Sequence, residues 1–216
     1  MKRIVLLVAT LMVWAWPSYA KDGPRKALCP VCAVRGEMEK EVVRAHAEHD
    51  GKAYYLCSKN CKKEFDADPL AYARPKLPRP LPDFSVEALD GDVVNQTLTK
   101  GKLVLLDFWA TWCKPCVYMM SRLQVLYDAY AKKGLMVMGV SIDDGKDRVK
   151  KIEKFVDKID VTYPVYSDAR PTPAWHTFKV KAIPALFLIK DQEIVAQWLG
   201  NIDHADMESE IRKHLH

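Results

Sequence analysis

A Cys-x-x-Cys pair that directly follows an apolar run most strongly constrains the fold of this 216-residue chain. The run spans Leu103 to Phe108, and Cys113 and Cys116 lie where a helical pattern begins. At a helix N-terminus, unpaired backbone N–H groups and the helix dipole stabilise a thiolate. The thiolate is the attacking species in disulfide exchange. The spacing therefore predicts a redox pair in which Cys113 attacks and Cys116, one turn further along, resolves the mixed disulfide.

Residues 1–20 have the three-part pattern of a secretory signal peptide. Lys2 and Arg3 give a positive start, Ile4–Trp16 is apolar, and Ser18-Tyr19-Ala20 places small residues where signal peptidase reads them. The apolar run is shorter than the roughly 20 residues of a membrane span, and an uncleaved anchor is the alternative interpretation. Together with the thiol-exchange motif, this pattern predicts the bacterial cell envelope, specifically the periplasm.

The composition argues against one class of partner. The formal net charge is only +5, and that count includes both cations of the expected signal peptide. The sequence has no basic stripe with interleaved aromatic residues, so we expect no nucleic-acid partner. An apolar fraction of 49% is enough for one or two folded cores.

Two segments of different character follow the expected signal peptide. Residues 29–74 form a small, charged segment that carries four cysteines. Residues 75–82 contain four prolines and predict an extended, stiff linker, because proline fixes φ. Residues 83–216 alternate strand and helix patterns, which is typical of an α/β domain.

The pattern of residues 83–216 predicts individual elements. We expect hairpins at Asp90-Gly91 and Asp191-Gln192, and a helix from Cys113 to about Lys133 that ends at Gly134. Apolar runs predict buried strands over 103–108 and 135–142, and amphipathic spacing predicts a helix over 147–159. Asp203 is expected to cap a final helix. Four side chains of the first long helix are expected mainly in the core: Tyr118, Met119, Met120 and Tyr127.

This order of elements resembles the thioredoxin fold, a central mixed sheet flanked by helices. The motif from Trp112 to Cys116, the Ile183-Pro184 pair before a strand, and the long connection over 160–181 resemble TlpA/ResA-type thioredoxin-like proteins of the bacterial envelope. The resemblance covers residues 83–216. It implies a protein-disulfide oxidoreductase that acts on protein thiols and disulfides and needs no cofactor for its redox chemistry.

The resemblance also implies roles for single residues. Pro184 is expected to be cis beside the disulfide, with the Ile183 backbone offering hydrogen bonds to a substrate segment and Trp112 shielding the sulfurs. The alternative is an ordinary trans proline at the start of an edge strand. Asp107 matches the buried acid of thioredoxins and is expected to accept a proton from Cys116. The alternative is a partly hydrated residue at the end of a strand.

The direction of the redox reaction is less constrained by the residues. The Lys114-Pro115 dipeptide lacks the His that strong oxidants of this fold carry, which favours a reductase. The Lys114 charge opposes this, because it stabilises the Cys113 thiolate. TlpA-type proteins commonly carry Glu and Pro where this chain has Met119 and Ser121, so the specialised substrates of that family do not transfer. We expect a reductase, which in this compartment requires a membrane electron donor.

A second group of cysteines has metal-ligand spacing. Cys29 and Cys32 form a C-x2-C pair, Cys57 and Cys61 form a C-x3-C pair, and 24 residues lie between Cys32 and Cys57. Two such pairs can converge on one tetrahedral ion. Ser58 is expected to cap a helix with Cys61 in its first turn, as in treble-clef-like sites. Thiolates suit Zn²⁺ or Cu(I), and we expect one of these ions.

The same segment resembles the YHS domain, a small metal-associated module. The resemblance rests on the Cys-Pro-Val-Cys start and on the stretch from Gly51 to Tyr72, and it covers residues 29–74. His46 and His49 are the remaining candidate ligands, although we expect exposed or strand positions for both. Two disulfides among the four cysteines are the alternative, since so small a unit needs a staple of some kind.

These observations predict an envelope thiol–disulfide oxidoreductase of the TlpA type joined to a soft-metal module. The redox domain is expected to keep metal-binding thiols reduced, on its own module or on a metallochaperone partner. One alternative is a metal-delivery protein that uses the thioredoxin fold as a docking scaffold. Another is a thiol peroxidase, against which the paired cysteines at the helix start argue.

Overall fold

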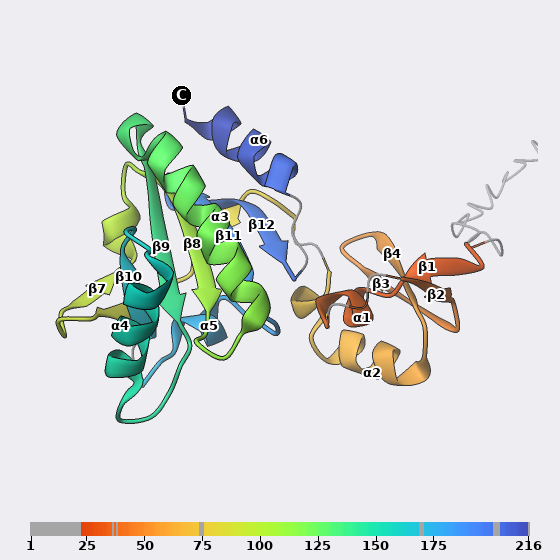
Figure 1. Cartoon of the computed structure of the whole chain (residues 1–216). Helices are drawn as coiled ribbons and strands as arrows, with labels where there is room; N and C mark the ends of the chain where they lie inside the picture. Colours follow the sequence, from red (N-terminus) through yellow and green to blue (C-terminus); the bar gives the residue numbers. More distant parts are fainter. Residues whose placement is uncertain are drawn as a thin grey trace, which may run out of the picture.

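The computed structural model describes residues 23–35, 37, 39–73, 76–168, 171–200 and 204–215. The expected signal peptide (1–20) and the expected helix cap at Asp203 lie outside the described residues, as does the start of the linker. Within the described residues, no helix combines the length and the apolar character that crossing a bilayer requires. Figure 1 shows the arrangement of the elements.

Residues 79–199 contribute an eight-stranded mixed sheet. Strands β8, β9 and β10 run parallel to one another, and every other neighbouring pair in the sheet is antiparallel. Flanked by helices, this sheet has the thioredoxin fold that the sequence predicted. In spatial order the strands are β5 (Arg79–Pro80), β12 (Glu193–Leu199), β11 (Ala185–Lys190), β8 (Leu103–Trp109), β9 (Leu135–Ser141), β10 (Val165–Asp168), β6 (Ser85–Ala88) and β7 (Val93–Asn95).

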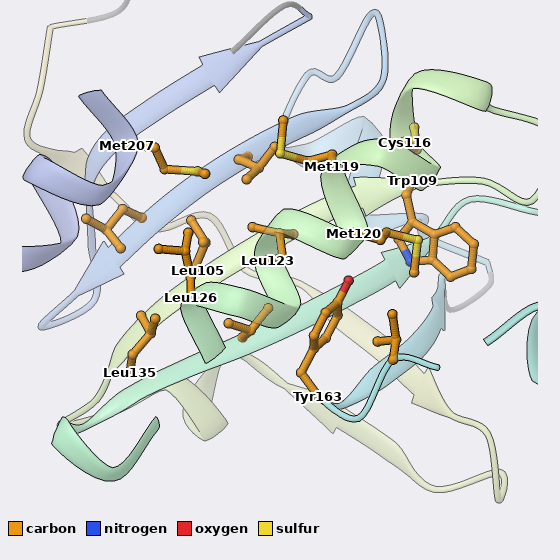
Figure 2. Close-up of a cluster of buried hydrophobic side chains, with 14 of the residues drawn as sticks. Leu105, Trp109, Cys116, Met119, Met120, Leu123, Leu126, Leu135, Tyr163 and Met207 are labelled. Carbon is orange, nitrogen blue, oxygen red and sulfur yellow. The ribbon is translucent and has the colours of Figure 1, made fainter. Parts of the chain in front are cut away.

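Helices cover both faces of the sheet, which explains why β8 is buried along its whole length. Leu105 and Trp109 point to the face packed by α3, α4 and α6, whereas Leu106 and Phe108 point to the face packed by α5. Figure 2 shows the first of these two clusters. The helices are α3 (Lys114–Tyr130), α4 (Arg148–Ile159), α5 (Ala174–Thr177) and α6 (His204–His214), with short 3₁₀ turns η2 (Gln96–Thr99) and η3 (Ala131–Lys133).

Most of the expected elements of this part are confirmed. Both hairpins form, at Asp90-Gly91 and Asp191-Gln192, and the first long helix ends through η3 at Gly134, whose φ is +103°. Four elements were not predicted. β10 and α5 interrupt the long connection over 160–181, and η2 follows β7. β5 lies inside the expected linker over 75–82, where Arg79–Pro80 pairs with β12 and so joins the sheet. The expectation for Tyr118 was wrong, because its side chain lies 59% exposed on α3, whereas Met119 and Met120 are buried.

The four-cysteine region folds around a core of its own, and we call residues 26–73 the cysteine segment. Two short antiparallel pairs, β1–β2 and β3–β4, surround the helices α1 and α2. Val31, Leu56 and Phe65 are completely buried there together with cysteine side chains. The elements are β1 (Lys26–Leu28), α1 (Pro30–Val34), β2 (Lys40–Val42), β3 (Ala45–His49), β4 (Lys52–Leu56), α2 (Lys59–Ala67) and η1 (Pro69–Ala71).

Candidate active site and metal site

Cys113 is the N-cap of α3, as its position in the sequence indicated. Its backbone is extended (φ −88°, ψ 94°), and its sulfur accepts the Cys116 backbone N–H at 3.3 Å. The two sulfurs form a disulfide with an S–S distance of 2.07 Å. Pro115 lies in the first turn, where its missing N–H removes no helical hydrogen bond. In the reduced state, the same N–H groups are placed to stabilise a Cys113 thiolate.

The two cysteines differ in accessibility. Cys116, in the first turn of α3, is completely buried, whereas Cys113 retains 5% of its surface. Trp112, which precedes Cys113, is 67% exposed and offers an aromatic surface beside the disulfide. An incoming disulfide therefore meets Cys113 before Cys116, and the order of attack expected from the sequence stays a prediction.

The Ile183-Pro184 segment lies beside Cys113. The Ile183–Pro184 peptide bond is cis, as the family resemblance implied. The Ile183 carbonyl oxygen is 3.9 Å from the Cys113 sulfur, and the Gly200 N–H donates to the Pro184 carbonyl at 3.0 Å. The segment thus brings backbone groups next to the reactive sulfur. Trp112 and Ile183 are accordingly both adjacent to Cys113.

Asp107 lies completely buried on β8, opposite Gly139 of the parallel strand β9. Neither carboxylate oxygen has a hydrogen-bond partner among the described residues, and burial raises the pKa of this carboxyl from 3.8 to about 8. A partly hydrated strand end, the alternative interpretation, is therefore wrong. At neutral pH the carboxyl is mainly protonated, and a modest change of its surroundings suffices to move its proton.

Two further polar groups of this core were missed by the sequence analysis. The Trp109 indole N–H and the Tyr163 hydroxyl are also buried without a hydrogen-bond partner in the described part of the chain. They meet at Gly139, where a Cβ atom would lie 3.1 Å from the Tyr163 ring and 3.2 Å from the Trp109 nitrogen. Figure 2 shows the Tyr163 hydroxyl pointing toward Trp109 and Met120. Burial, with a contribution from the Asp107 charge, raises the pKa of Tyr163.

A carboxylate clamp holds the loop before Cys113. Asp143, which follows β9, accepts the Thr111 backbone N–H at 2.8 Å and the Thr111 hydroxyl at 2.7 Å. It also accepts the Ser141 hydroxyl at 2.7 Å. The sequence analysis missed this clamp, although one signal was available. The carboxyl ends of neighbouring parallel strands meet at one edge, and polar residues follow both β8 and β9.

The four cysteines of the cysteine segment converge as predicted. Ser58 caps α2 by accepting the Cys61 N–H at 3.0 Å, so Cys57 precedes the helix and Cys61 lies in its first turn. The sulfur–sulfur distances are 3.4 Å for Cys32–Cys57, 3.5 Å for Cys57–Cys61 and 4.0 Å for Cys32–Cys61. All four sulfurs, including that of Cys29, lie within 4.8 Å of one another, and none is disulfide-bonded.

This donor set fits a soft metal ion. Four sulfurs at about 2.3 Å from a tetrahedral Zn²⁺ stand about 3.8 Å apart, close to the spacing observed here. Among the described residues the potential ligand group contains only these cysteines and neither His46 nor His49. A Zn²⁺ or Cu(I) ion would neutralise thiolate charge at this partly buried place.

The electrostatics of Cys29, Cys32 and Cys57 also favour a bound cation. Burial raises the pKa of Cys32 and of Cys57. Burial also acts to raise the pKa of Cys29, but hydrogen bonds from Cys57 and Cys32 outweigh it and lower that pKa. One thiolate at a time is therefore favoured unless a cation is present. The nearby Arg35 is engaged by Glu64, to which its guanidinium donates at 2.6 and 2.8 Å.

Comparison with known proteins agrees with this site. Residues 78–198 match the AhpC/TSA family, and this range includes Asp107, Cys113, Cys116 and Pro184 but none of the cysteine-segment thiols. The thioredoxin-like protein YneN of Bacillus subtilis is 32% identical over 131 residues, which cover 60% of this chain and 75% of YneN. The thiol-disulfide oxidoreductase ResA of Bacillus cereus is 35% identical over 133 residues, which cover 61% and 75% of the two chains.

Solved structures resemble the same part of the chain. A Chlorobium tepidum protein assigned as the thiol:disulfide interchange protein DsbE superimposes with a TM-score of 0.57 at 28% identity, covering 64% of this chain and 97% of that one. A thiol:disulfide interchange protein from Bacteroides sp. gives a TM-score of 0.57 at 22% identity, covering 65% and 90%, and supports the fold. With a paired Cys113–Cys116 at the start of α3, the chain belongs to the AhpC/TSA family and is a thiol–disulfide oxidoreductase with a thioredoxin fold.

Proposed function

We propose that this protein reduces protein disulfides in the bacterial cell envelope and that its cysteine segment is a YHS-like module for a soft metal ion. The observation that carries the redox half is Cys113 at the start of α3, with the Ile183 backbone beside it. The signal-like residues 1–20 support the periplasm, and the absence of His between the cysteines supports a reductase.

In the proposed reaction, the Cys113 thiolate attacks a substrate disulfide and forms a mixed disulfide. The substrate then lies along Ile183-Pro184 and against the exposed Trp112. Cys116 loses its proton and attacks the Cys113 sulfur, which releases the reduced substrate. The fraction of Asp107 that is ionised near neutral pH accepts that proton, because the raised pKa makes this carboxylate a stronger base than an ordinary one. A membrane electron donor returns the Cys113–Cys116 pair to the dithiol.

The redox proposal is tested with insulin. The reduced protein is expected to cleave insulin disulfides, and the Cys113–Cys116 couple is expected near the reducing end of the thioredoxin range, about −270 mV. A measured potential near about −120 mV, typical of strong oxidants of this fold, would contradict the reductase direction. The oxidoreductase class itself does not depend on that result.

For the cysteine segment, the proposal rests on four sulfurs within 4.8 Å of one another. Cys29, Cys32, Cys57 and Cys61 would hold the ion, and metal binding would stabilise a small core. Titration of the reduced full chain with Cd²⁺ is expected to give thiolate-to-metal absorption that saturates at one ion. Cys57→Ser is expected to weaken binding at least tenfold, whereas Cys113→Ser is expected to leave it unchanged. Absence of a saturating signal would contradict the metal site. A count of free thiols in the protein isolated without reductant tests the two-disulfide alternative.

We further propose that the redox pair keeps metal-binding thiols reduced, on the cysteine segment or on a metallochaperone partner. Metal occupancy in air is expected to fall in a Cys113→Ser variant, because oxidised cysteines cannot ligate. Occupancy that is unaffected by this change would contradict the coupling. The alternative, a metal-delivery protein with the thioredoxin fold as scaffold, predicts metal transfer without insulin turnover.

A further inference from the structure

Two contacts join the cysteine segment to the redox part of the chain. The first is electrostatic. Asp68, which ends α2, places its carboxylate 3.4 Å from the Lys181 ammonium and 3.9 Å from that of Lys179. Both lysines come shortly before Ile183-Pro184 in the chain. The segment is therefore attached next to the backbone that lies beside Cys113.

The second contact is between backbones. The Ala33 carbonyl oxygen of α1 faces Gly200, 3.6 Å from the position that a Cβ atom on that glycine would occupy. Gly200 follows β12 and donates its N–H to the Pro184 carbonyl at 3.0 Å. Its φ of +71° suits glycine, and the missing side chain leaves room for the Ala33 carbonyl oxygen beside Gly200. Figure 1 shows α1 next to the end of β12.

Together these contacts form a short path between the two sulfur sites. The Cys113 sulfur lies 3.9 Å from the Ile183 carbonyl oxygen. The next residue, Pro184, accepts a hydrogen bond from Gly200, and Gly200 faces the Ala33 carbonyl oxygen. Ala33 directly follows Cys32, a member of the four-sulfur cluster. The cysteine segment thus lies at the edge of the redox part formed by Lys179, Lys181 and Gly200, close to the Ile183-Pro184 backbone beside the reactive sulfur.

The attachment is reversible on energetic grounds. The lysine side chains are 50% and 44% exposed and Asp68 is 31% exposed, so water screens both ion pairs and each holds the segment only weakly. The covalent connection, however, keeps the segment tethered, so release and return of the contact occur within one chain. A weakly held, tethered group of thiols is well suited to meet Cys113 repeatedly without blocking it permanently.

We propose that the cysteine segment is an intramolecular substrate of the Cys113–Cys116 pair, docked through Asp68 and Ala33 on the edge formed by Lys179, Lys181 and Gly200. The inference rests on the proposed function and adds a defined partner to it. The disulfide that the redox pair reduces is one formed within the four-cysteine cluster of the same chain. Cys32 and Cys57, whose sulfurs are 3.4 Å apart, are the pair nearest to bonding distance among the measured sulfur pairs.

The exchange balances in two steps. The Cys113 thiolate attacks Cys32, so the Cys32–Cys57 bond breaks, a Cys113–Cys32 bond forms, and Cys57 leaves as a thiolate that takes up a proton. Cys116 gives its proton to Asp107 and attacks Cys113, which forms Cys113–Cys116 and releases Cys32. Two electrons pass from the redox dithiol to the cysteine-segment disulfide. An external dithiol reductant restores the redox pair.

The test uses a Cys116→Ala variant of the full chain, in which the mixed disulfide cannot be resolved. Mild oxidation with diamide at low micromolar protein is followed by peptide mass spectrometry without reduction. We expect a disulfide within one chain between Cys113 and a cysteine of the segment, at a yield independent of protein concentration. Higher salt is expected to lower its rate of formation, because the attachment includes exposed ion pairs.

Charge reversal checks the docking contact. In the Cys116→Ala background, Asp68→Lys is expected to slow cross-link formation about threefold or more, and adding Lys181→Asp is expected to recover part of the rate. The matched control is Asp66→Lys, because Asp66 lies on the same helix but pairs with Lys62 inside α2. This control makes the same charge change and is expected to leave the rate within about twofold.

Two outcomes would overturn the inference: cross-links only between different chains, or equal rates for Asp68→Lys and Asp66→Lys. Wild-type turnover of insulin is measured in parallel. If the wild type reduces insulin but no intramolecular cross-link forms, the intramolecular substrate is contradicted and the proposed reductase stands. If the wild type does not reduce insulin, the proposed reductase itself is contradicted.

Discussion

The Cys113 sulfur lies 3.9 Å from the Ile183 carbonyl oxygen, while its disulfide partner Cys116, in the first turn of α3, is completely buried. This relationship separates the roles of two chemically identical side chains. The Cys113 sulfur, which borders the Ile183-Pro184 loop, retains some exposed surface and is the one that we expect a substrate to reach. The Cys116 sulfur is completely buried and bonded to Cys113.

The first prediction concerns this difference in accessibility. Cys116→Ala is expected to accumulate a mixed disulfide with insulin, because Cys113 can attack but nothing resolves the product. Cys113→Ala is expected to accumulate at least tenfold less, because Cys116 is buried. Non-reducing electrophoresis of both variants measures the adduct. Equal trapping by the two variants would show that Cys116 is also reachable from solvent.

The second prediction concerns Asp107 and pH. Its pKa rises from 3.8 to about 8 on folding, so between these values the folded state holds a proton that the unfolded state has released. Raising the pH through this window therefore favours unfolding, by up to about 1.4 kcal/mol per pH unit. Asp107→Asn lacks this titration. Its free energy of unfolding is expected to exceed that of the wild type by more at pH 8 than at pH 5.

Urea unfolding of both oxidised proteins at the two pH values measures that difference. Below about pH 4 the Asp107 side chain is neutral in both states, so its titration adds no difference there. A gap between the variants that stays constant from pH 5 to pH 8 would contradict a raised Asp107 pKa. The substitution is also expected to slow resolution by Cys116, seen as a longer-lived mixed disulfide.

The third prediction concerns Gly139. A Cβ atom there would lie 3.1 Å from the Tyr163 ring and 3.2 Å from the Trp109 nitrogen, and both side chains are packed in the core. Gly139→Ala is therefore expected to destabilise the fold by about 1–3 kcal/mol through overcrowding. Thermal unfolding measures the effect. An unchanged midpoint would show that Tyr163 moves aside freely.

The fourth prediction concerns Asp143. Asp143→Ala leaves the Thr111 N–H, the Thr111 hydroxyl and the Ser141 hydroxyl without their acceptor, and it is expected to cost about 2–3 kcal/mol of stability. Asp143→Asn keeps an acceptor oxygen and is expected to cost less. Because Thr111 lies two residues before Cys113, the alanine variant is also expected to shift the measured Cys113 pKa. Iodoacetamide reactivity as a function of pH measures that shift, and identical profiles would confine Asp143 to a purely structural role.

Some parts of the molecule could be read from short stretches of sequence. The apolar run 103–108 predicted β8, and the Cys-x-x-Cys spacing predicted a cysteine at the N-terminus of α3, because both patterns depend on neighbours along the chain. The Ser58 cap and the placement of Cys57 and Cys61 follow from the same kind of local rule. The expectation for Tyr118 failed, because Tyr118 lies on the exposed face of α3 that also carries Arg122, whose guanidinium donates to the Tyr118 hydroxyl at 2.6 Å.

Sequence by itself determined the reactive cysteines, the strand and the helix on either side of them, and the two pairs of potential metal ligands. Each of these features depends on residues that lie close together along the chain. Tertiary structure alone decided that four residues pack together in the core: Asp107, Trp109, Gly139 and Tyr163. It also decided that Asp68 forms an ion pair with Lys181. Those groups come from strands and loops far apart in sequence. Only the pairing of β8 with β9 and the packing of α2 against the redox part bring them together.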